Sequence, residues 1–173
     1  MLEGQITKAL SGFYYVTTQK GQTYRTKARG LFRKKELTPL VGDYVTFDLE
    51  EGQDGTILEV KDRKNLLVRP PIANIDLAFV ISSAVDPKFS QQLLDRMLVV
   101  LESIHIQPAI YISKLDLAPH DLVHEIKVLQ DYYQNLGYDF LCPEDGQVNQ
   151  GQMQAIIGHK RVVFMGQSGV GKS

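Results

Sequence analysis

The most chemically specific stretch of this sequence is GQSGVGKS at residues 166–173, which matches the pattern G-x-x-x-x-G-K-[S/T]. In that pattern a glycine-rich turn points backbone N–H groups at phosphate oxygens, the lysine reaches the outer phosphates, and the last hydroxyl ligates Mg²⁺. We therefore predict a P-loop that binds nucleotide phosphates, with Ser173 as the Mg²⁺ ligand and the following binding residues: Gly166, Gln167, Ser168, Gly169, Val170, Gly171, Lys172 and Ser173.

A second candidate is SKLD at residues 113–116, directly after the apolar run Pro108–Ser113. The carboxylate of Asp116 can accept two parallel hydrogen bonds from guanine, one from the ring N–H and one from the exocyclic amine. The aliphatic stem of Lys114 can lie along the base. A K-x-D pattern alone is a weak signal. In one sheet with a P-loop, it predicts the base-reading loop of a GTPase, formed by Ser113, Lys114 and Asp116.

The elements that must position these loops alternate between strand and helix. Apolar runs at Ile75–Ala84, Pro108–Ser113, Tyr138–Cys142 and Arg161–Met165 predict buried parallel strands. Helical spacing predicts a helix capped by Ser90, a second with Leu122, Ile126, Leu129, Tyr133 and Leu136 on one face, and a short one near Met153–His159. This order indicates an α/β domain, in which ligands bind at the carboxyl ends of the strands.

The first part of the chain has a different pattern. Five short strands separated by turn signals are expected at Glu3–Leu10, Gly12–Thr18, Gln22–Ala28, Asp43–Leu49 and Gly55–Asp62. Five strands are too few for two broad sheets, so they predict a small closed OB-fold barrel. The change of pattern at RPPIAN (69–74) places the domain boundary there, with an OB-fold RNA-binding domain at 1–68 and a GTPase domain at 69–173.

Charge separates the same two parts. Residues 1–69 carry 12 Lys and Arg against 9 Asp and Glu, whereas residues 70–173 carry 7 against 11. Basic residues of the first part are interspersed with aromatic residues, namely Tyr14, Tyr15, Tyr24, Phe32, Tyr44 and Phe47. This mixture suggests an RNA-binding surface on which the aromatic rings stack with bases and the cations neutralise phosphates. The alternative is that these aromatic residues fill the barrel. The candidate RNA contacts are Arg25, Lys27, Arg29, Arg33, Lys34 and Lys35.

The order of the two nucleotide motifs is unusual. SKLD precedes GQSGVGKS by about 50 residues, whereas in ordinary GTPases the P-loop comes first. This indicates a circular permutation. The chain resembles the RsgA-type family of circularly permuted GTPases along almost its whole length, in the following motifs: ARGLFRK (28–34), VGDYV (41–45), RKNLLVRPPIANID (63–76), FSQQLLDRMLV (89–99), YISKLDL (111–117) and FMGQSGVGKS (164–173).

The resemblance implies an OB domain that contacts ribosomal RNA and a permuted domain that hydrolyses GTP, with Mg²⁺, in a way that depends on the small ribosomal subunit. Such a protein acts late in maturation of that subunit. The family also has a C-terminal zinc-binding domain, which is expected beyond residue 173. Two departures are Ser113, where Asn or Thr is more usual and which is expected to weaken the tie to the P-loop, and CPED (142–145), where the third guanine-contacting loop is not legible.

The resemblance also places switch I and switch II after Ser173, so the catalytic residues are expected outside this sequence. We expect the 173-residue chain by itself to bind GTP poorly and to hydrolyse essentially none. Two other hypotheses for the function remain open. An ATP-using P-loop enzyme has no need of SKLD, and an RNA-binding module with a vestigial P-loop binds RNA without responding to nucleotide.

Composition limits the remaining classes. No apolar run approaches the roughly 20 residues that span a bilayer, and the N-terminus has no apolar signal sequence. We therefore expect a cytoplasmic protein that does not engage membranes. We also expect a monomer, although no motif determines the oligomeric state. The single cysteine, Cys142, forms no internal disulfide. His120 and His124 have the i, i+4 spacing of a zinc pair, but the sequence indicates no third ligand.

Overall fold

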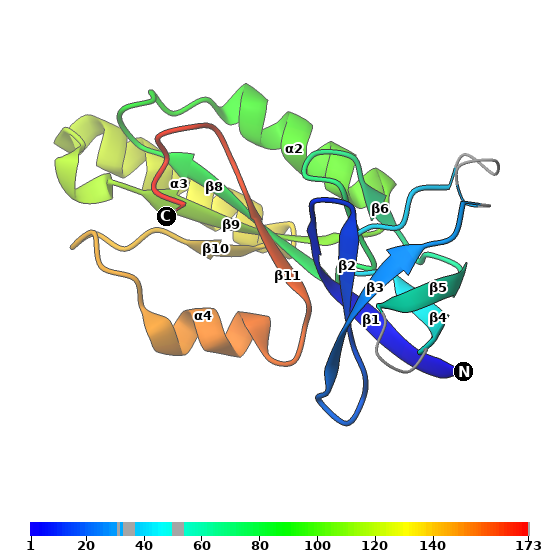
Figure 1. Ribbon diagram of the computed structural model, residues 1–173. Helices are drawn as coiled ribbons and strands as arrows, with labels where there is room; N and C mark the ends of the chain where they lie inside the picture. Colours follow the sequence, from blue (N-terminus) through cyan, green and yellow to red (C-terminus); the bar gives the residue numbers. More distant parts are fainter. Residues whose placement is uncertain (31, 33–36, 50–53, 173) are drawn as a thin grey trace. The chain divides into compact units, whose positions relative to one another are not determined.

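The computed structural model describes residues 1–30, 32, 37–49 and 54–172, and its contacts divide the chain into two units (Figure 1). One unit is Met1–Asn74 and the other is Ile75–Ser173. The first is built of β-strands, and the second alternates strands with helices, as the two sequence patterns predict.

The first unit is a closed five-stranded barrel with the strand order β1-β2-β3-β5-β4. All neighbouring strands are antiparallel except β3 and β5, which pair in parallel. The predicted strands are all present, and their observed bounds are β1 Leu2–Leu10, β2 Phe13–Thr17, β3 Thr23–Ala28, β4 Tyr44–Asp48 and β5 Gly55–Val60. A short ribbon of β6 (Leu66–Leu67) and β7 (Ile72–Ala73) follows the barrel.

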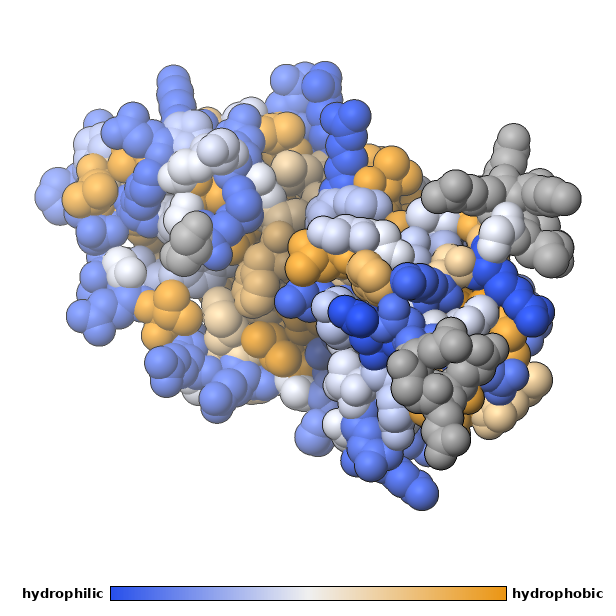
Figure 2. All heavy atoms as spheres, in the orientation of Figure 1, coloured by the Kyte–Doolittle hydropathy of each residue, from blue (hydrophilic) through white to orange (hydrophobic). Residues whose placement is uncertain are grey.

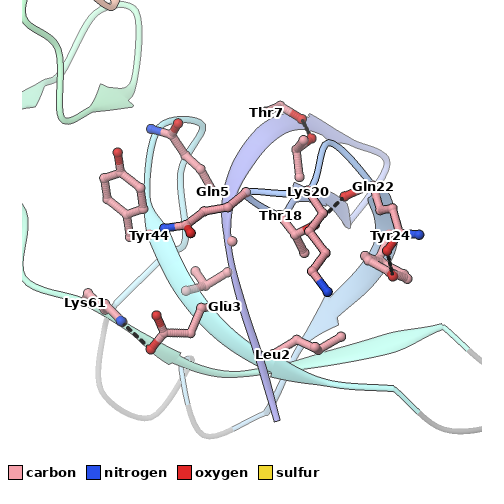
Figure 3. A pocket seen from close by; sticks show the side chains of 14 residues that line it. Leu2, Glu3, Gln5, Thr7, Thr18, Lys20, Gln22, Tyr24, Tyr44 and Lys61 are labelled. Carbon is pink, nitrogen blue, oxygen red and sulfur yellow. Dashed lines mark hydrogen bonds and ion pairs between the residues drawn. The ribbon is translucent and has the colours of Figure 1, made fainter.

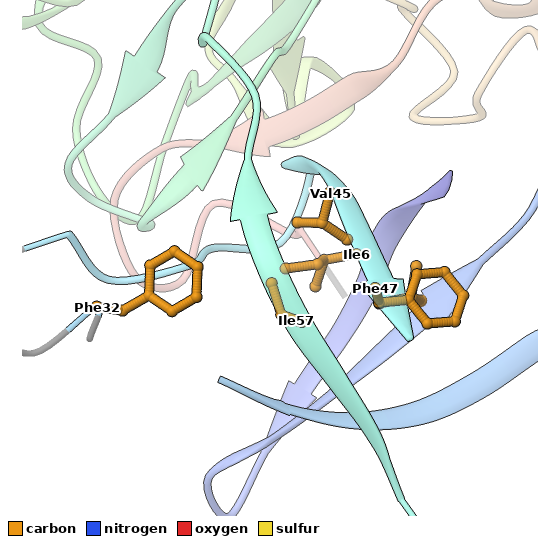
Figure 4. Close-up of a cluster of buried hydrophobic side chains, with 6 residues drawn as sticks. Ile6, Phe32, Val45, Phe47 and Ile57 are labelled. Carbon is orange, nitrogen blue, oxygen red and sulfur yellow. The ribbon is translucent and has the colours of Figure 1, made fainter. Parts of the chain in front are cut away.

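The interior of the barrel is filled by alternate residues of its strands, because successive side chains of a strand point to opposite faces. The buried cluster consists of Ile6, Val16, Phe32, Val45, Phe47 and Ile57 (Figure 4). Tyr14 and Tyr24 pack against it, whereas Tyr44 is 42% exposed. Most of the aromatic residues considered as RNA-stacking candidates therefore belong to the core.

A polar cluster closes the barrel near the VGDYV motif. Asp43 is fully buried, and both of its oxygens accept hydrogen bonds from the guanidinium of Arg63, each at 2.7 Å. The same guanidinium donates to Thr38 O, and Asp43 also accepts from the backbone N–H of Leu40. Desolvation opposes ionisation of the guanidinium, but the Asp43 bonds prevail and raise the pKa of Arg63. Arg63 is thus a structural cation.

The second unit contains a four-stranded parallel sheet with the order β10-β9-β8-β11. Its strands are β8 (Leu77–Ser83), β9 (Gln107–Ser113), β10 (Asp139–Leu141) and β11 (Val162–Met165). Burial on both faces explains the continuous apolar runs, since every residue of β8 except Ser82 is buried. The carboxyl ends of β8, β9 and β11 therefore meet at one edge, where the sequence places both nucleotide motifs.

Helices cover both faces of this sheet (Figure 1). Helices α2 (Gln91–Ser103) and α3 (His120–Asn135) lie side by side, since the hydroxyl of Tyr133 on α3 donates to Asp95 on α2 at 2.6 Å. Helix α4 (Gln150–Ile157) packs on the other face through Met153, Ile156 and Ile157. The one-turn 3-10 helix η1 (Leu115–Leu117) follows β9.

Two details of the predicted helices were wrong. Helix α4 begins at Gln150, three residues before the predicted start, because the side chain of Asn149 caps it by accepting from the N–H of Gln152. It ends at Ile157, before Gly158, whose positive φ breaks the helix. Leu136 is 59% exposed instead of buried, because α3 ends at Asn135. The Ser90 cap of α2 is confirmed, since its hydroxyl accepts from the N–H of Leu93.

Among the described residues, no helix has the length and apolar character needed to cross a bilayer. The visible face of the barrel unit mixes hydrophilic and hydrophobic side chains (Figure 2).

Candidate nucleotide-binding site

The P-loop begins where β11 ends, and its first glycine is required by close packing. A Cβ built on Gly166 lies 2.2 Å from the carbonyl oxygen of Ile81 on β8, closer than two nonbonded atoms can approach. The loop is also anchored by Val170, which is 1% exposed and packs with Leu77, Phe79 and Ile81 of β8. The P-loop therefore packs directly on the sheet at Gly166 and at Val170.

From Gly169 onward the loop backbone has the bent form that phosphate binding needs. Gly169 and Gly171 both have a φ of +84°, a conformation that strains residues with a Cβ. The ammonium of Lys172 donates to the carbonyls of Gly166 at 3.0 Å and Gln167 at 2.5 Å, so its charge is held within the same loop. These features fit a nucleotide phosphate, whose oxygens would accept from the loop N–H groups and from Lys172. Ser173, the predicted Mg²⁺ ligand, lies outside the described residues.

The predicted base-reading loop contacts the P-loop directly. The hydroxyl of Ser113 donates to Val170 O at 2.7 Å, and the ammonium of Lys114 donates to Gly169 O at 2.9 Å. We expected serine at position 113 to weaken the contact between the two loops. The hydrogen bond is nevertheless formed, because the serine hydroxyl is long enough to reach the P-loop carbonyl. Lys114 has a φ of +56°, which starts η1 and turns the following residues away from the strand.

Asp116 lies in η1 with an exposed side chain. None of the hydrogen bonds or ion pairs among the described residues involves its carboxylate, so both oxygens are free to accept from a ligand. The loop after β10 approaches it, since a Cβ built on Gly146 would lie 2.7 Å from Oδ1 of Asp116. Gly146 directly follows CPED (142–145), where the sequence did not reveal the third guanine-contacting loop, so this loop borders the predicted base site.

One contributor was missed by sequence reasoning, namely the turn after β8. Its Asp86 carbonyl accepts a hydrogen bond from the ammonium of Lys114, which is thereby held between this turn and the P-loop. The N–H of Ala84 donates to Ser113 O at 2.9 Å. Three loops thus meet at the carboxyl edge of the sheet. The only available signal was that this turn follows the parallel strand Ile75–Ala84 next to the one carrying SKLD.

The predicted RNA contacts of the barrel divide into two groups. Arg25, Lys27 and Arg29 have exposed side chains in or just after β3, and Arg33, Lys34 and Lys35 lie outside the described residues. The cations of Arg25 and Lys27 lie 4.8 Å and 4.9 Å from the ring centroid of Phe13, while both pair with Asp54 at 2.5 Å and 3.2 Å. These bonds lower the pKa of Asp54, that to Arg25 most strongly.

Lys8 lies over the ring of Tyr15 on the same outer surface, at 5.3 Å. Tyr15 is paired with Arg25 across β2 and β3. We call Lys8, Phe13, Tyr15, Arg25 and Lys27 the cation–aromatic face. Sequence reasoning missed Phe13 and Lys8. For Phe13 the signal was present, because Phe13 and Tyr15 alternate along β2 opposite the basic residues of β3.

The barrel also carries an open groove of about 630 Å³ (Figure 3). It is lined mainly by polar side chains, among them Gln5, Thr7, Lys20, Tyr24 and Tyr44. At one end Lys61 pairs with Glu3 at 2.6 Å. Within the part of the chain that the structure describes, no three His, Cys, Asp or Glu residues are grouped as metal ligands would be.

Fold and site together define a class: an OB-like barrel followed by a P-loop α/β unit whose base-reading loop precedes its phosphate loop in the sequence. Residues 60–173 match the family model described as RsgA GTPase, and residues 3–57 match the model described as RsgA N-terminal domain. This chain belongs to the RsgA GTPase family. The resemblance and the fold class predicted from sequence are both confirmed.

The names of similar proteins agree with this family assignment. The chain is 52% identical over 174 residues to a protein of Oceanobacillus iheyensis named small ribosomal subunit biogenesis GTPase RsgA 2, spanning 100% of this chain and 59% of the relative. It is 51% identical to one named RsgA 1 in Listeria monocytogenes, again spanning 100% and 59%. The chain thus covers about three fifths of the length of these curated relatives.

Two solved structures share the fold. One is YloQ, titled a circularly permuted GTPase, with a TM-score of 0.79 and 46% identity over 99% of this chain and 62% of that one. The other is YjeQ from Thermotoga maritima, with a TM-score of 0.86 and 29% identity over the same shares of the two chains.

Proposed function

We propose that the protein carrying this chain binds GTP and hydrolyses it to GDP and phosphate in a reaction that depends on the small ribosomal subunit. One observation carries the nucleotide part: Ser113 and Lys114 bond directly to the P-loop carbonyls of Val170 and Gly169. These bonds bring two motifs that are far apart in sequence beside each other, which supports a single site with the base at Asp116 and the phosphates at the P-loop. The subunit part rests on the family and on the names of the relatives.

Roles within the site follow from the contacts. Lys114 and Ser113 hold the base loop against the P-loop, and Asp116 accepts from the ring N–H and amine of guanine. The loop N–H groups and Lys172 bind the phosphates. Mg²⁺ bound through Ser173 would neutralise charge on the phosphates. We also propose, from the sequence pattern and composition, domains at residues 1–68 and 69–173, a cytoplasmic location and a monomeric state. From the family resemblance we propose zinc in a C-terminal domain.

Replacing Asp116 with Asn tests the base assignment. The neutral amide loses the charge-assisted bonds to guanine, so we expect GTP affinity to fall about 10- to 100-fold. Affinity for xanthosine triphosphate should rise relative to GTP, because the amide donates to the additional carbonyl of xanthine. Competition against a fluorescent GTP analogue measures both. The control is Asp121→Asn, an exposed aspartate in the first turn of α3.

The same titration separates the competing functions. ATP competing as well as GTP would favour an ATP-using P-loop enzyme. RNA affinity that ignores every nucleotide, together with an unchanged Asp116→Asn protein, would favour an RNA-binding module.

For the barrel we propose RNA contact through the cation–aromatic face and Arg29. Arg29 is exposed and has no ion pair within the described residues, whereas Arg25 and Lys27 share Asp54. We expect Arg29→Gln to reduce the slope of log affinity against log salt by about 0.7 on a single-stranded RNA. Asp54→Asn should instead raise affinity roughly two- to tenfold at low salt, since it releases two cations. An Asp54→Asn protein with unchanged affinity would contradict this surface.

A further inference from the structure

We infer that Gly146, in the loop after β10, is a positioning residue for guanine recognition, because the space left by its missing side chain sets where the carboxylate of Asp116 can lie. The inference rests on the proposed function of Asp116 and adds a residue to the site that no motif in the sequence marks. It concerns the segment 142–148, which has none of the sequence features of a guanine-contacting loop.

The contact is close and covers the whole carboxylate. A Cβ built on Gly146 would lie 2.7 Å from Oδ1, 2.8 Å from Cγ and 3.1 Å from Oδ2 of Asp116. Gly146 therefore faces the carboxylate itself and not the stem of the side chain. The φ of Gly146 is +70°, which turns the loop so that its Cα faces Asp116.

The loop is held in this place by its neighbours. The N–H of Gln147 donates to Oδ1 of Asp145 at 3.0 Å, and the N–H of Gly146 donates to Pro143 O, which together form a tight turn. On its other side, Lys127 of α3 pairs with Glu144 at 2.8 Å. With the loop fixed, a new Cβ must be accommodated by Asp116.

The carboxylate is the part that can yield. It is the far end of an exposed side chain and has no hydrogen bond within the described residues, so rotation about its side-chain torsions relieves the clash without disturbing the core. Rotation also takes the two oxygens out of the plane in which they accept from guanine. A substitution at Gly146 should therefore impair base discrimination more than folding.

The chain offers a matched control. Gly137, which follows α3, has a φ of +92°, and among the described residues no atom other than those of its chain neighbours lies within 4 Å of its built Cβ. Gly137→Ala thus introduces similar backbone strain with no carboxylate nearby. Gly146→Asn is a second variant, since Asn tolerates positive φ better than Ala but still carries a Cβ.

The experiment measures the affinity of the intact protein for GTP and for ITP, which lacks the exocyclic amine of guanine. We expect Gly146→Ala and Gly146→Asn to lower the GTP-to-ITP affinity ratio about tenfold, the equivalent of one charge-assisted hydrogen bond. The GTP-to-GDP ratio should stay at its wild-type value, because the phosphates bind elsewhere. Gly137→Ala should leave both ratios unchanged.

A double-mutant cycle separates positioning from general damage. In an Asp116→Ala background, Gly146→Ala should have no further effect on the GTP-to-ITP ratio. If the ratio falls equally with or without Asp116, or does not fall in either Gly146 variant, the inference is overturned while the proposed function stands. A wild-type protein that binds ATP as tightly as GTP would overturn the proposed function and this inference with it.

Discussion

Arg63→Met should lower the free energy of unfolding of the barrel by about 3–5 kcal/mol, because it leaves a buried carboxylate without its counter-charge. Asp43 is 0% exposed and takes both of its charged hydrogen bonds from Arg63. Methionine retains much of the aliphatic stem of arginine, so lost packing contributes little. Chemical denaturation followed by tyrosine fluorescence measures the change, because four of the eight tyrosines lie in the barrel unit and the signal of the other four is common to the variant and the wild type.

An exposed ion pair on the same barrel provides the control. Lys61 and Glu3 lie 2.6 Å apart, but their side chains are 42% and 66% exposed, so water screens the charges. Lys61→Met should therefore cost less than about 1 kcal/mol. Equal losses in the two variants would mean that the buried pair has no special role in stability.

The sequence predicted the architecture because local patterns and fold agree for most of this chain. Alternation with turn signals indicated the five barrel strands, and continuous apolar runs indicated the parallel sheet. The nucleotide motifs lie where those elements end, so their meeting at one edge followed from the parallel order of the strands. Ion pairs between residues distant in sequence could not be predicted. Nothing in the sequence indicated that Arg63 binds Asp43 and does not lie among the exposed cations.

The register of the barrel strands was the second feature that the sequence did not predict. A bulge in β1 between Ile6 and Lys8 breaks the two-residue alternation, so whether Lys8 faces inward or outward cannot be read from the pattern. Bulges depend on local twist and leave little trace in sequence. The same holds for Gly146, whose proximity to Asp116 depends on how two loops fold at the sheet edge and not on either loop's residue types.

Gly166→Ala should lower nucleotide affinity by at least about 100-fold, the second large effect that we expect. The added methyl lies 2.2 Å from Ile81 O. The methyl is bonded directly to the Cα of residue 166 and the oxygen is a backbone atom, and both stretches of backbone are held by the pairing of β11 with β8. Neither can move as a side chain does, so the strand end and the P-loop must shift together. Displacement of about 1 Å is enough to misalign the loop N–H groups with the phosphates, with losses of this order.

Gly151→Ala tests whether such a loss is specific to the loop. Gly151 lies in the first turn of α4, and the nearest atom that its built Cβ meets among the described residues outside the helix backbone is Oδ1 of Asn149, at an ordinary 3.5 Å. Alanine favours the helix, so the variant should be as stable as the wild type, or more stable by up to about 1 kcal/mol, with unchanged affinity. Fluorescent GTP and GDP analogues report the two affinities, and far-UV circular dichroism checks the fold. Because the clash moves the phosphate site, Gly166→Ala should weaken both nucleotides equally. A loss confined to GTP would mean that Gly166 acts on the γ-phosphate alone.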